Sequence, residues 1–209
     1  MTDINKTLFD LAHHAVRYRN NITFIQHVDK LLDAGADPSL QYDRRTNAFM
    51  WSCMTNGYNM FKKLLSSKNY HDLNQRNQLG NTVLIIACQL NRYEIIQMLL
   101  NNDRVTCDLN ILNDNGFTAL TYAINNNNHD IIKLLLDYDA IIYDVDHINN
   151  YINNNNLQLV NKQNNINYIR ELKILSDLLY AFLRYENNVE ILSRHPQIIS
   201  LINLLPKKN

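Results

Sequence analysis

The chain has few of the residues that interrupt regular structure: among its 209 residues there are four glycines and three prolines. Four scattered glycines do not form a glycine-rich phosphate-binding loop, which argues against a nucleotide-binding enzyme of that type. No apolar run reaches the ~18 residues that a membrane span needs. The first residues, Met1 to Lys6, also lack the basic start and apolar stretch of a secretory signal. These absences predict a cytoplasmic protein without a membrane partner.

The chain also lacks an excess of charge of either sign. Its 20 basic and 20 acidic residues give a formal net charge of zero, and no long block of one sign occurs. The electrostatic signature of a nucleic-acid-binding protein is therefore absent in bulk, and we expect no nucleic-acid partner. A hydrophobic content of 46% is ample for a packed core and argues against wholesale disorder.

Groups of residues with catalytic or metal-binding spacing are missing as well. The three cysteines, an odd number, stand at no metal-binding spacing: Cys53, Cys88 and Cys107. We expect them to be free, packed thiols in a reducing compartment. The adjacent pair His13-His14 points about 100° apart on a helix and does not form an i, i+4 metal pair. We therefore predict no catalytic residue, no metal and no cofactor, and a protein that is not an enzyme.

Asparagine is the most unusual component of the chain. It supplies 34 of the 209 residues, and isoleucine and tyrosine are also plentiful. This is the bias expected of an AT-rich genome, and it suggests a large DNA virus or an intracellular pathogen as the source. The asparagine runs at 125–128 and 153–156 lie between apolar segments, where asparagine suits turns and helix caps.

One motif occurs twice and organises the chain. Residues 77–87 return, with similar pattern, as residues 113–123, and each copy is followed by a second apolar segment, at 93–100 and at 129–136. A turn with glycine, a short apolar helix, a loop and a second helix form a unit that cannot bury itself alone. Such units stack into a solenoid, which is typical of a partner-binding scaffold.

The apolar pattern predicts how each unit packs. Residues 83–87 are almost continuously apolar, as in a short helix buried between neighbours, whereas 93–100 carries the stripe of a one-sided helix. Gly80 and Gly116 supply the backbone freedom of a tight turn, and Thr82 and Thr118 are placed to cap the first helix. The predicted core residues are Leu84, Ile96, Leu99, Leu120, Ile132 and Leu135.

These segments resemble the ankyrin-repeat family. Residues 80–84 and 116–120 are similar to the family's G-x-T-P-L start, and residues 31–38 are similar to its L-L-x-x-G-A-D ending. The resemblance implies an all-α ankyrin-repeat solenoid with hairpin loops, and a protein as the partner. The chain departs from the family pattern at two places. The first is the loop after Leu100, which is about three residues longer than the ~33-residue period requires. The second is Arg45, which occupies the position that Gly80 has in the next repeat, so we expect a hairpin of different shape there.

The expected domains follow from where the repeats begin and fade. Residues 1–143 are assigned to ankyrin repeats, with an N-terminal capping unit at 5–38 and repeats at about 44–75, 77–110 and 113–143. Residues 144–209 are assigned to a degenerate repeat and a helical C-terminal cap. Within this part we expect a hairpin at Asp144–Asp146, a longer helix over about 166–185, and a final helix that begins at His195-Pro196.

The leading functional hypothesis is a monomeric, non-enzymatic scaffold that binds a protein, from a host if the source is a virus or pathogen, in the host cytoplasm. Binding would use the concave ankyrin face, formed by hairpin tips and the ends of first helices. The candidate partner-binding residues are Tyr42, Arg44, Met54, Arg76, Gln78, Leu90, Leu112, Asp114 and Asn126. Tyr42, Ile111 and Leu112 lie between repeats, where they either anchor a partner or pack on the neighbouring hairpin. Arg44-Arg45 has the best functional claim of the basic pairs.

Two other functional classes are alternatives to a scaffold. The first is a substrate adaptor for a ubiquitin ligase, docking through helices at 166–205, as in viral ankyrin proteins with C-terminal modules. Against it, Leu204-Leu205-Pro206 comes at the very end, whereas an F-box-like segment begins with Leu-Pro and continues for tens of residues. The second is an enzyme with a catalytic C-terminal part, which contains no recognisable triad, dyad or metal set.

Overall fold

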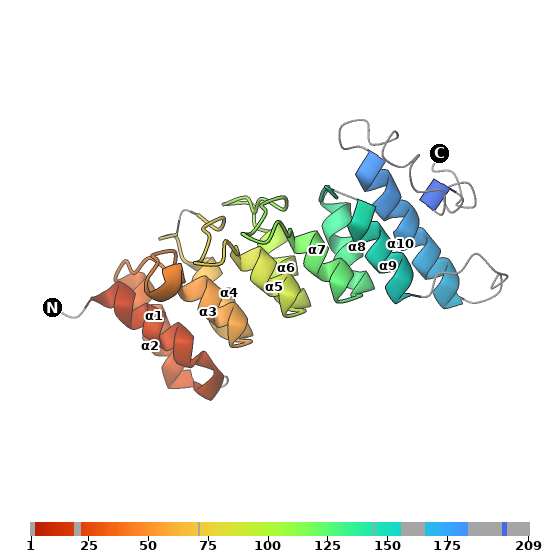
Figure 1. The fold of residues 1–209 in the computed structure, drawn as a ribbon. Coiled ribbons are helices and arrows are strands. Elements are labelled where there is room, and N and C mark those ends of the chain that lie inside the picture. Colours follow the sequence, from red (N-terminus) through yellow and green to blue (C-terminus); the bar gives the residue numbers. More distant parts are fainter. Residues whose placement is uncertain are drawn as a thin grey trace. The chain divides into compact units, whose positions relative to one another are not determined.

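The computed structural model describes residues 3–18, 22–70, 72–143, 145–155, 166–183 and 198–199. Within these ranges the regular elements are ten α-helices and two short 3₁₀ helices, without a strand (Figure 1). This confirms the predicted all-α fold. Contacts between Cα atoms divide the chain into two compact units, residues 1–119 and 120–209.

The first unit consists of three stacked helix pairs. The pairs are α1 (Ile4–His14) with α2 (Ile22–Asp33), α3 (Ala48–Met54) with α4 (Tyr58–Ser66), and α5 (Val83–Gln89) with α6 (Tyr93–Leu100). The short 3₁₀ segments η1 (Ala15–Tyr18) and η2 (Asp43–Arg45) lie in the connections. Helix α3 packs against both α1 and α5, and α4 packs against both α2 and α6. First helices and second helices therefore form two layers (Figure 1).

The core lies where the sequence pattern predicts it. All six predicted core residues are at most 1% exposed. Helix α5 buries almost every side chain because it lies between the preceding first helix and its own partner α6, whereas α6 keeps one face in solvent. Thr82 begins α5 as predicted, since its Oγ1 accepts a hydrogen bond from the Ile85 amide at 3.2 Å.

Asparagine forms the turn between the two helices of each repeat. Asn56, Asn91 and Asn127 adopt left-handed φ angles of 53°, 55° and 52°. The amide that follows each asparagine donates to a carbonyl five residues back; Arg92, for example, donates to Ala87 at 2.8 Å. This is the Schellman ending of a helix, in which asparagine tolerates the left-handed position better than most residues. Part of the large asparagine content is therefore accounted for by these turns, where asparagine lies outside the helices.

The second helices end on the same motif, with glycine in one case and aspartate in another. Gly35 has φ 93° and lies beside the bond from the Ala36 amide to Leu31 O at 3.0 Å. Asp139 has φ 63° in the equivalent place, where the Ala140 amide donates to Leu135 O at 3.0 Å. The side chain of Asp139 therefore imposes a backbone cost that Gly35 avoids.

We expect Asp139→Gly to raise the free energy of unfolding by about 0.5 kcal/mol, because relief of the left-handed position exceeds the entropy that glycine adds to the unfolded chain. Urea unfolding followed by circular dichroism measures the change. The control is Asp137→Gly at the last residue of a helix, where glycine should lower stability. A loss of stability in both variants would show that the left-handed backbone position does not strain Asp139.

The second unit holds the last repeat and a long helix. It contains α8 (His129–Asp137), α9 (Val145–Asn154) and α10 (Ile166–Leu183), and α7 (Ala119–Asn125) begins at its boundary. Helix α10 packs against α8 and α9, and it buries Leu175, Leu178 and Phe182. The fully buried Tyr151 places its hydroxyl 3.0 Å from Nδ1 of His129, which gives this histidine a structural role.

Two expectations for the C-terminal part meet different outcomes. The hairpin expected at Asp144–Asp146 is wrong, because α9 already begins at Val145 and continues the helical layer. The final helix expected from His195-Pro196 lies outside the described residues except for 198–199, which are helical. The domain boundary after residue 143 stays a prediction. No helix of the described ranges is long and apolar enough to cross a membrane.

Candidate functional site

Three loops of the first unit form matching hairpin tips. We call residues 42–46 the first tip, 77–81 the second tip and 113–117 the third tip. Each is closed by a backbone bond from its first amide to its last carbonyl: 2.8 Å in the first tip and 2.9 Å in the second and third. The shared closing bond shows that the three loops are variants of one turn.

An asparagine side chain holds the second tip and the third tip. Oδ1 of Asn77 accepts from the amides of Leu79 and Asn81 at 2.9 and 3.0 Å. Asn113 Oδ1 makes the equivalent two bonds at 3.0 and 2.9 Å. Gly80 and Gly116 then take φ 74° and 76°, the left-handed position that glycine adopts without strain. Sequence and turn geometry therefore agree at both tips.

The first tip differs, as predicted from Arg45. Tyr42 stands where the other tips have asparagine, and two residues in succession, Arg44 and Arg45, take left-handed φ angles of 53° and 54°. The amide of Arg45 still donates to Tyr42 O at 3.0 Å, so the turn closes in the same way. A non-glycine residue in this region costs on the order of 1 kcal/mol, which makes the first tip the strained member of the three.

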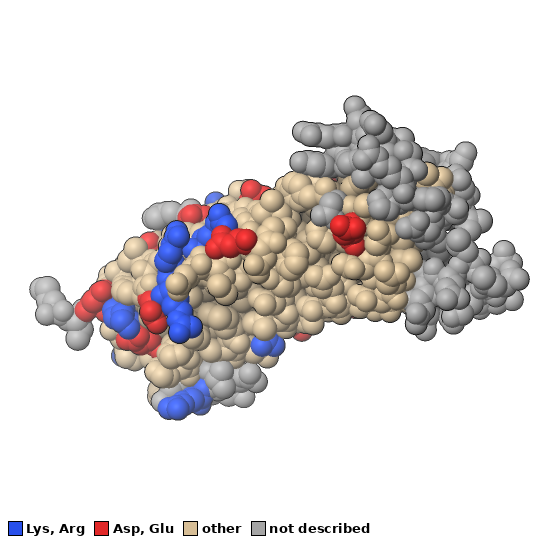
Figure 2. All heavy atoms as spheres, in the orientation of Figure 1, with Lys and Arg blue, Asp and Glu red and all other residues tan. Residues whose placement is uncertain are grey.

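Bonds between neighbouring tips join them into a row. The Gln78 amide donates to Arg44 O at 2.9 Å, and the Asp114 amide donates to Leu79 O at 3.2 Å. An ion pair of 2.7 Å joins Arg76 Nη2 to Asp114 Oδ1. Figure 2 shows basic and acidic side chains interspersed on one face of the first unit. The tips thus present a polar surface that is fixed before any partner arrives.

The predicted partner-binding residues do not all lie on one surface of the first unit. Arg44, Arg76, Gln78 and Asp114 meet on the row of tips and are exposed, and Leu112 directly before the third tip is 41% exposed. Half-buried Met54 ends α3 and exposed Leu90 follows α5, at the ends of these helices away from the tips. Exposed Asn126 belongs to the second unit. Which of them contact a partner stays a prediction.

Tyr42 packs onto the first helix instead of projecting freely. Its ring lies 5.0 Å from that of Phe9 in α1, and its hydroxyl donates to Asp3 Oδ2 at 3.2 Å. Burial, together with the negative charge of Asp3, raises the pKa of Tyr42 to about 12. Ile111 is also half-buried. Of the three apolar residues expected between repeats, Leu112 is the one that remains exposed.

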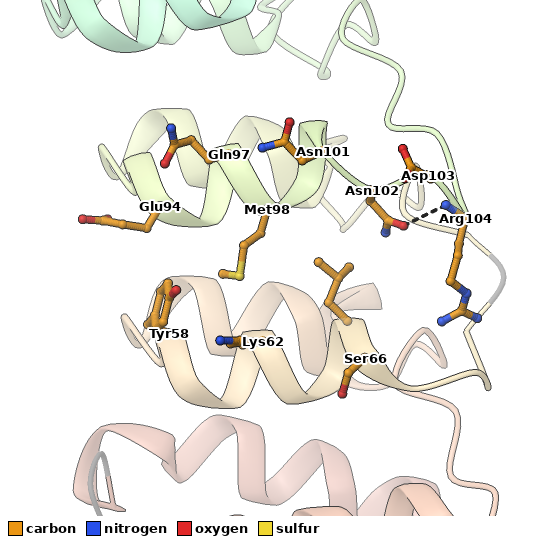
Figure 3. Close-up of a pocket in the computed structure, with 11 residues that line it drawn as sticks. Tyr58, Lys62, Ser66, Glu94, Gln97, Met98, Asn101, Asn102, Asp103 and Arg104 are labelled. Carbon is orange, nitrogen blue, oxygen red and sulfur yellow. Dashed lines mark hydrogen bonds between the residues drawn. The ribbon is translucent and has the colours of Figure 1, made fainter.

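A groove between the second helices is a feature that the sequence pattern did not reveal. It has a volume of about 610 Å³ and lies between α4 and α6. Figure 3 shows Met98 pointing into the space between these helices, with Tyr58 and Glu94 toward one end and Arg104 at the other. Acidic and basic side chains, such as Glu94 and Lys62, line the groove together with apolar Leu65 and Met98.

The long loop after Leu100 closes one end of this groove. Its Asn102 side chain donates to the Tyr70 hydroxyl at 2.7 Å, and the Arg104 guanidinium lies 5.0 Å above the Tyr70 ring and donates to Ser67 O. The added residues therefore fold back over the preceding repeat. The sequence feature that could have indicated this groove is the loop after Leu100, which makes the repeat longer than its usual period.

The three cysteines are thiols with little exposure to solvent. Cys53 and Cys88 are buried and Cys107 is half-buried. Burial raises the pKa of Cys53 to about 12 and that of Cys88 well above its ordinary value. These thiols stay protonated near neutral pH, and a thiol is a poor nucleophile. The described residues include no group of three or more His, Cys, Asp or Glu side chains that could hold a metal ion.

Comparison with known families identifies the repeat. A family model of ankyrin repeats in three copies matches residues 12–106, and one of ankyrin repeats in many copies matches residues 90–136. A search of curated proteins gave no match. The two family matches together run from α1 into α8 and cover more than half of the chain, over the same stacked helix pairs and tips. The chain belongs to the ankyrin-repeat family.

Proposed function

We propose that the protein is a non-enzymatic scaffold that binds a protein partner through the row of tips, on the concave face expected for this family. The carrying observation is the set of bonds between tips, from Arg44 O to the Gln78 amide and from Leu79 O to the Asp114 amide. A surface that is ordered before binding loses little conformational entropy in the complex. That property favours recognition of a folded or extended protein by this edge of the repeats.

The chemistry of the tips suits a mixed interface. Leu112 offers an exposed apolar side chain before the third tip, while exposed Gln78 and Arg76 offer hydrogen-bond donors in and directly before the second tip. Arginine is enriched among the few residues that carry most of the binding energy of an interface, and burial of an apolar side chain such as Leu112 adds a favourable contribution. The exposed Arg76–Asp114 pair contributes at most ~1 kcal/mol to folding, so its residues are available for function.

We expect the double variant Arg76→Ala/Leu112→Ala to weaken partner binding by more than about tenfold while leaving the melting temperature nearly unchanged. The partner is first recovered by affinity purification from candidate host cells and identified by mass spectrometry. Titration calorimetry then measures its affinity for each variant. Tyr42 is left intact because its contact with Phe9 would confound stability with binding.

The matched control is Tyr58→Ala, which removes a side chain that is 41% exposed on α4, at the groove of the second-helix layer. It should leave affinity unchanged. If Arg76→Ala/Leu112→Ala binds the partner normally and Tyr58→Ala binds it more weakly, the interface lies at the groove and the proposal is contradicted.

The adaptor alternative depends on the C-terminal helices. In the second unit, α10 directs Leu175, Leu178 and Phe182 into its contacts with α8 and α9, so these apolar side chains are not available for docking on a ligase. This favours a structural role for α10. Recovery of ubiquitin-ligase subunits that depends on residues 166–205 would support the adaptor instead.

The compartment and source belong to the same proposal. The asparagine-rich composition supports an AT-rich genome, such as that of a large DNA virus or an intracellular pathogen. On that basis the partner is a host protein and the site of action is the host cytoplasm. We propose a monomer, since the row of tips is complete within one chain.

A further inference from the structure

Arginine occupies a backbone position in the first tip where folding favours glycine. The equivalent residues of the second and third tips are Gly80 and Gly116, with φ 74° and 76°, whereas Arg45 takes φ 54° and is preceded by Arg44 at φ 53°. Closing the turn does not require arginine, because the glycine tips close with the same bond. Strained residues cluster at functional sites, so two such arginines in succession mark this turn as a candidate site.

The first tip is held firmly despite its strain. The Arg45 amide donates to Tyr42 O at 3.0 Å, and the Thr46 amide donates to Asp43 O at 3.0 Å. Arg45 O accepts from Gln41 Nε2 at 2.8 Å, and Arg44 O accepts from the second tip. These bonds fix the backbone from which both guanidinium groups project.

Both arginines are exposed and, among the described residues, neither forms an ion pair, in contrast to Arg76, which pairs with Asp114. Asp43, on the same tip, is exposed and offsets one of the two positive charges. Asp3, which accepts from the Tyr42 hydroxyl, is a second acidic group beside the tip, so the tip would attract a carboxylate through its two unpaired guanidinium groups and not through an excess of positive charge.

We propose that the Arg44–Arg45 turn binds carboxylate side chains of an acidic segment in the partner protein. The inference rests on the proposed function and names the partner's chemistry at this tip. Guanidinium groups bind carboxylates through two parallel N–H···O bonds, a geometry that lysine does not reproduce. A rigid turn that presents two such groups side by side selects closely spaced glutamate or aspartate residues.

The charge distribution favours an acidic protein over a nucleic acid. Nucleic-acid binding draws its affinity from many basic contacts to successive phosphates. Here Asp43 and Asp114 interrupt the arginines of the row, and the chain has no net charge. A short carboxylate cluster avoids these acidic residues, whereas a continuous phosphate backbone passes over them.

The test measures binding of fluorescein-labelled decaglutamate by fluorescence anisotropy, for the original chain and for Arg44→Gly/Arg45→Gly. We expect affinity to fall about tenfold or more, while the melting temperature stays equal or rises because glycine relieves the backbone. Arg44→Lys/Arg45→Lys keeps the charge and loses the bidentate geometry, so it should bind with intermediate affinity. Equal binding by the original chain and the glycine variant would overturn the proposal.

The charge-matched control is Lys30→Ala/Lys62→Ala, which removes two exposed cations from α2 and α4. It should bind decaglutamate as the original chain does; an equal loss of affinity would show non-specific attraction and overturn the inference. Tighter, arginine-dependent binding of a ten-nucleotide thymidine oligomer would also overturn it, in favour of nucleic acid.

The recovered partner separates the two proposals. If Arg76→Ala/Leu112→Ala loses the partner but Arg44→Gly/Arg45→Gly keeps it, the acidic-segment inference fails and the tip scaffold stands. If neither variant loses the partner, the proposed function itself fails. If both variants lose the partner and keep their melting temperatures, the tip scaffold and the acidic-segment inference are both supported.

Discussion

Replacement of Leu99 by alanine is expected to lower the free energy of unfolding by ~2–5 kcal/mol. Leu99 lies in α6, is 1% exposed, and belongs to the apolar face that this helix turns toward the core. Truncation removes buried apolar contacts and leaves a cavity that the neighbouring repeats fill only in part. Urea unfolding, followed by circular dichroism at 222 nm, measures the loss.

The control for this prediction is another leucine on the same repeat. Leu79, in the second tip, is 65% exposed, and its replacement by alanine should change stability by less than about 0.5 kcal/mol. A loss below ~1 kcal/mol for Leu99→Ala would mean that α6 turns a different face toward the core.

The second large effect is expected at Gly80. A Cβ atom there would overlap with Asp114 Oδ1 and would lie 2.7 Å from the Asp114 backbone nitrogen. The backbone atom cannot move without breaking the bond from this amide to Leu79 O, which joins the second and third tips. Left-handed strain at φ 74° adds to the overlap. We expect Gly80→Ala to cost about 2–4 kcal/mol in urea unfolding.

Gly116 provides a matched control for this substitution. It has nearly the same backbone angle, φ 76°, but an added Cβ there would meet nothing within 4 Å. Gly116→Ala should therefore cost only the strain, about 1–2 kcal/mol. The difference between the two variants isolates the close approach of Asp114. Equal losses would show that the tips are not packed as closely as the structure has them.

The sequence by itself determined the repeat and its core. The second helix predicted at 93–100 is α6 with the same bounds, and the turn predicted at Gly80 takes the left-handed angle. These features are encoded locally, because helix periodicity, caps and glycine turns depend on residues a few positions apart. The unusual residue at Arg45 likewise predicted a different hairpin, although not the second left-handed residue at Arg44.

Only the tertiary structure decided which candidate site residues are free. Tyr42 is covered by Phe9, a residue of another repeat, and the groove beside Met98 depends on a loop that folds back to Tyr70. Such contacts join residues about 30 positions apart, and their geometry follows from how neighbouring repeats stack. A local pattern identifies a tip or a long loop, but burial at that point depends on which side chain the adjacent repeat brings to it.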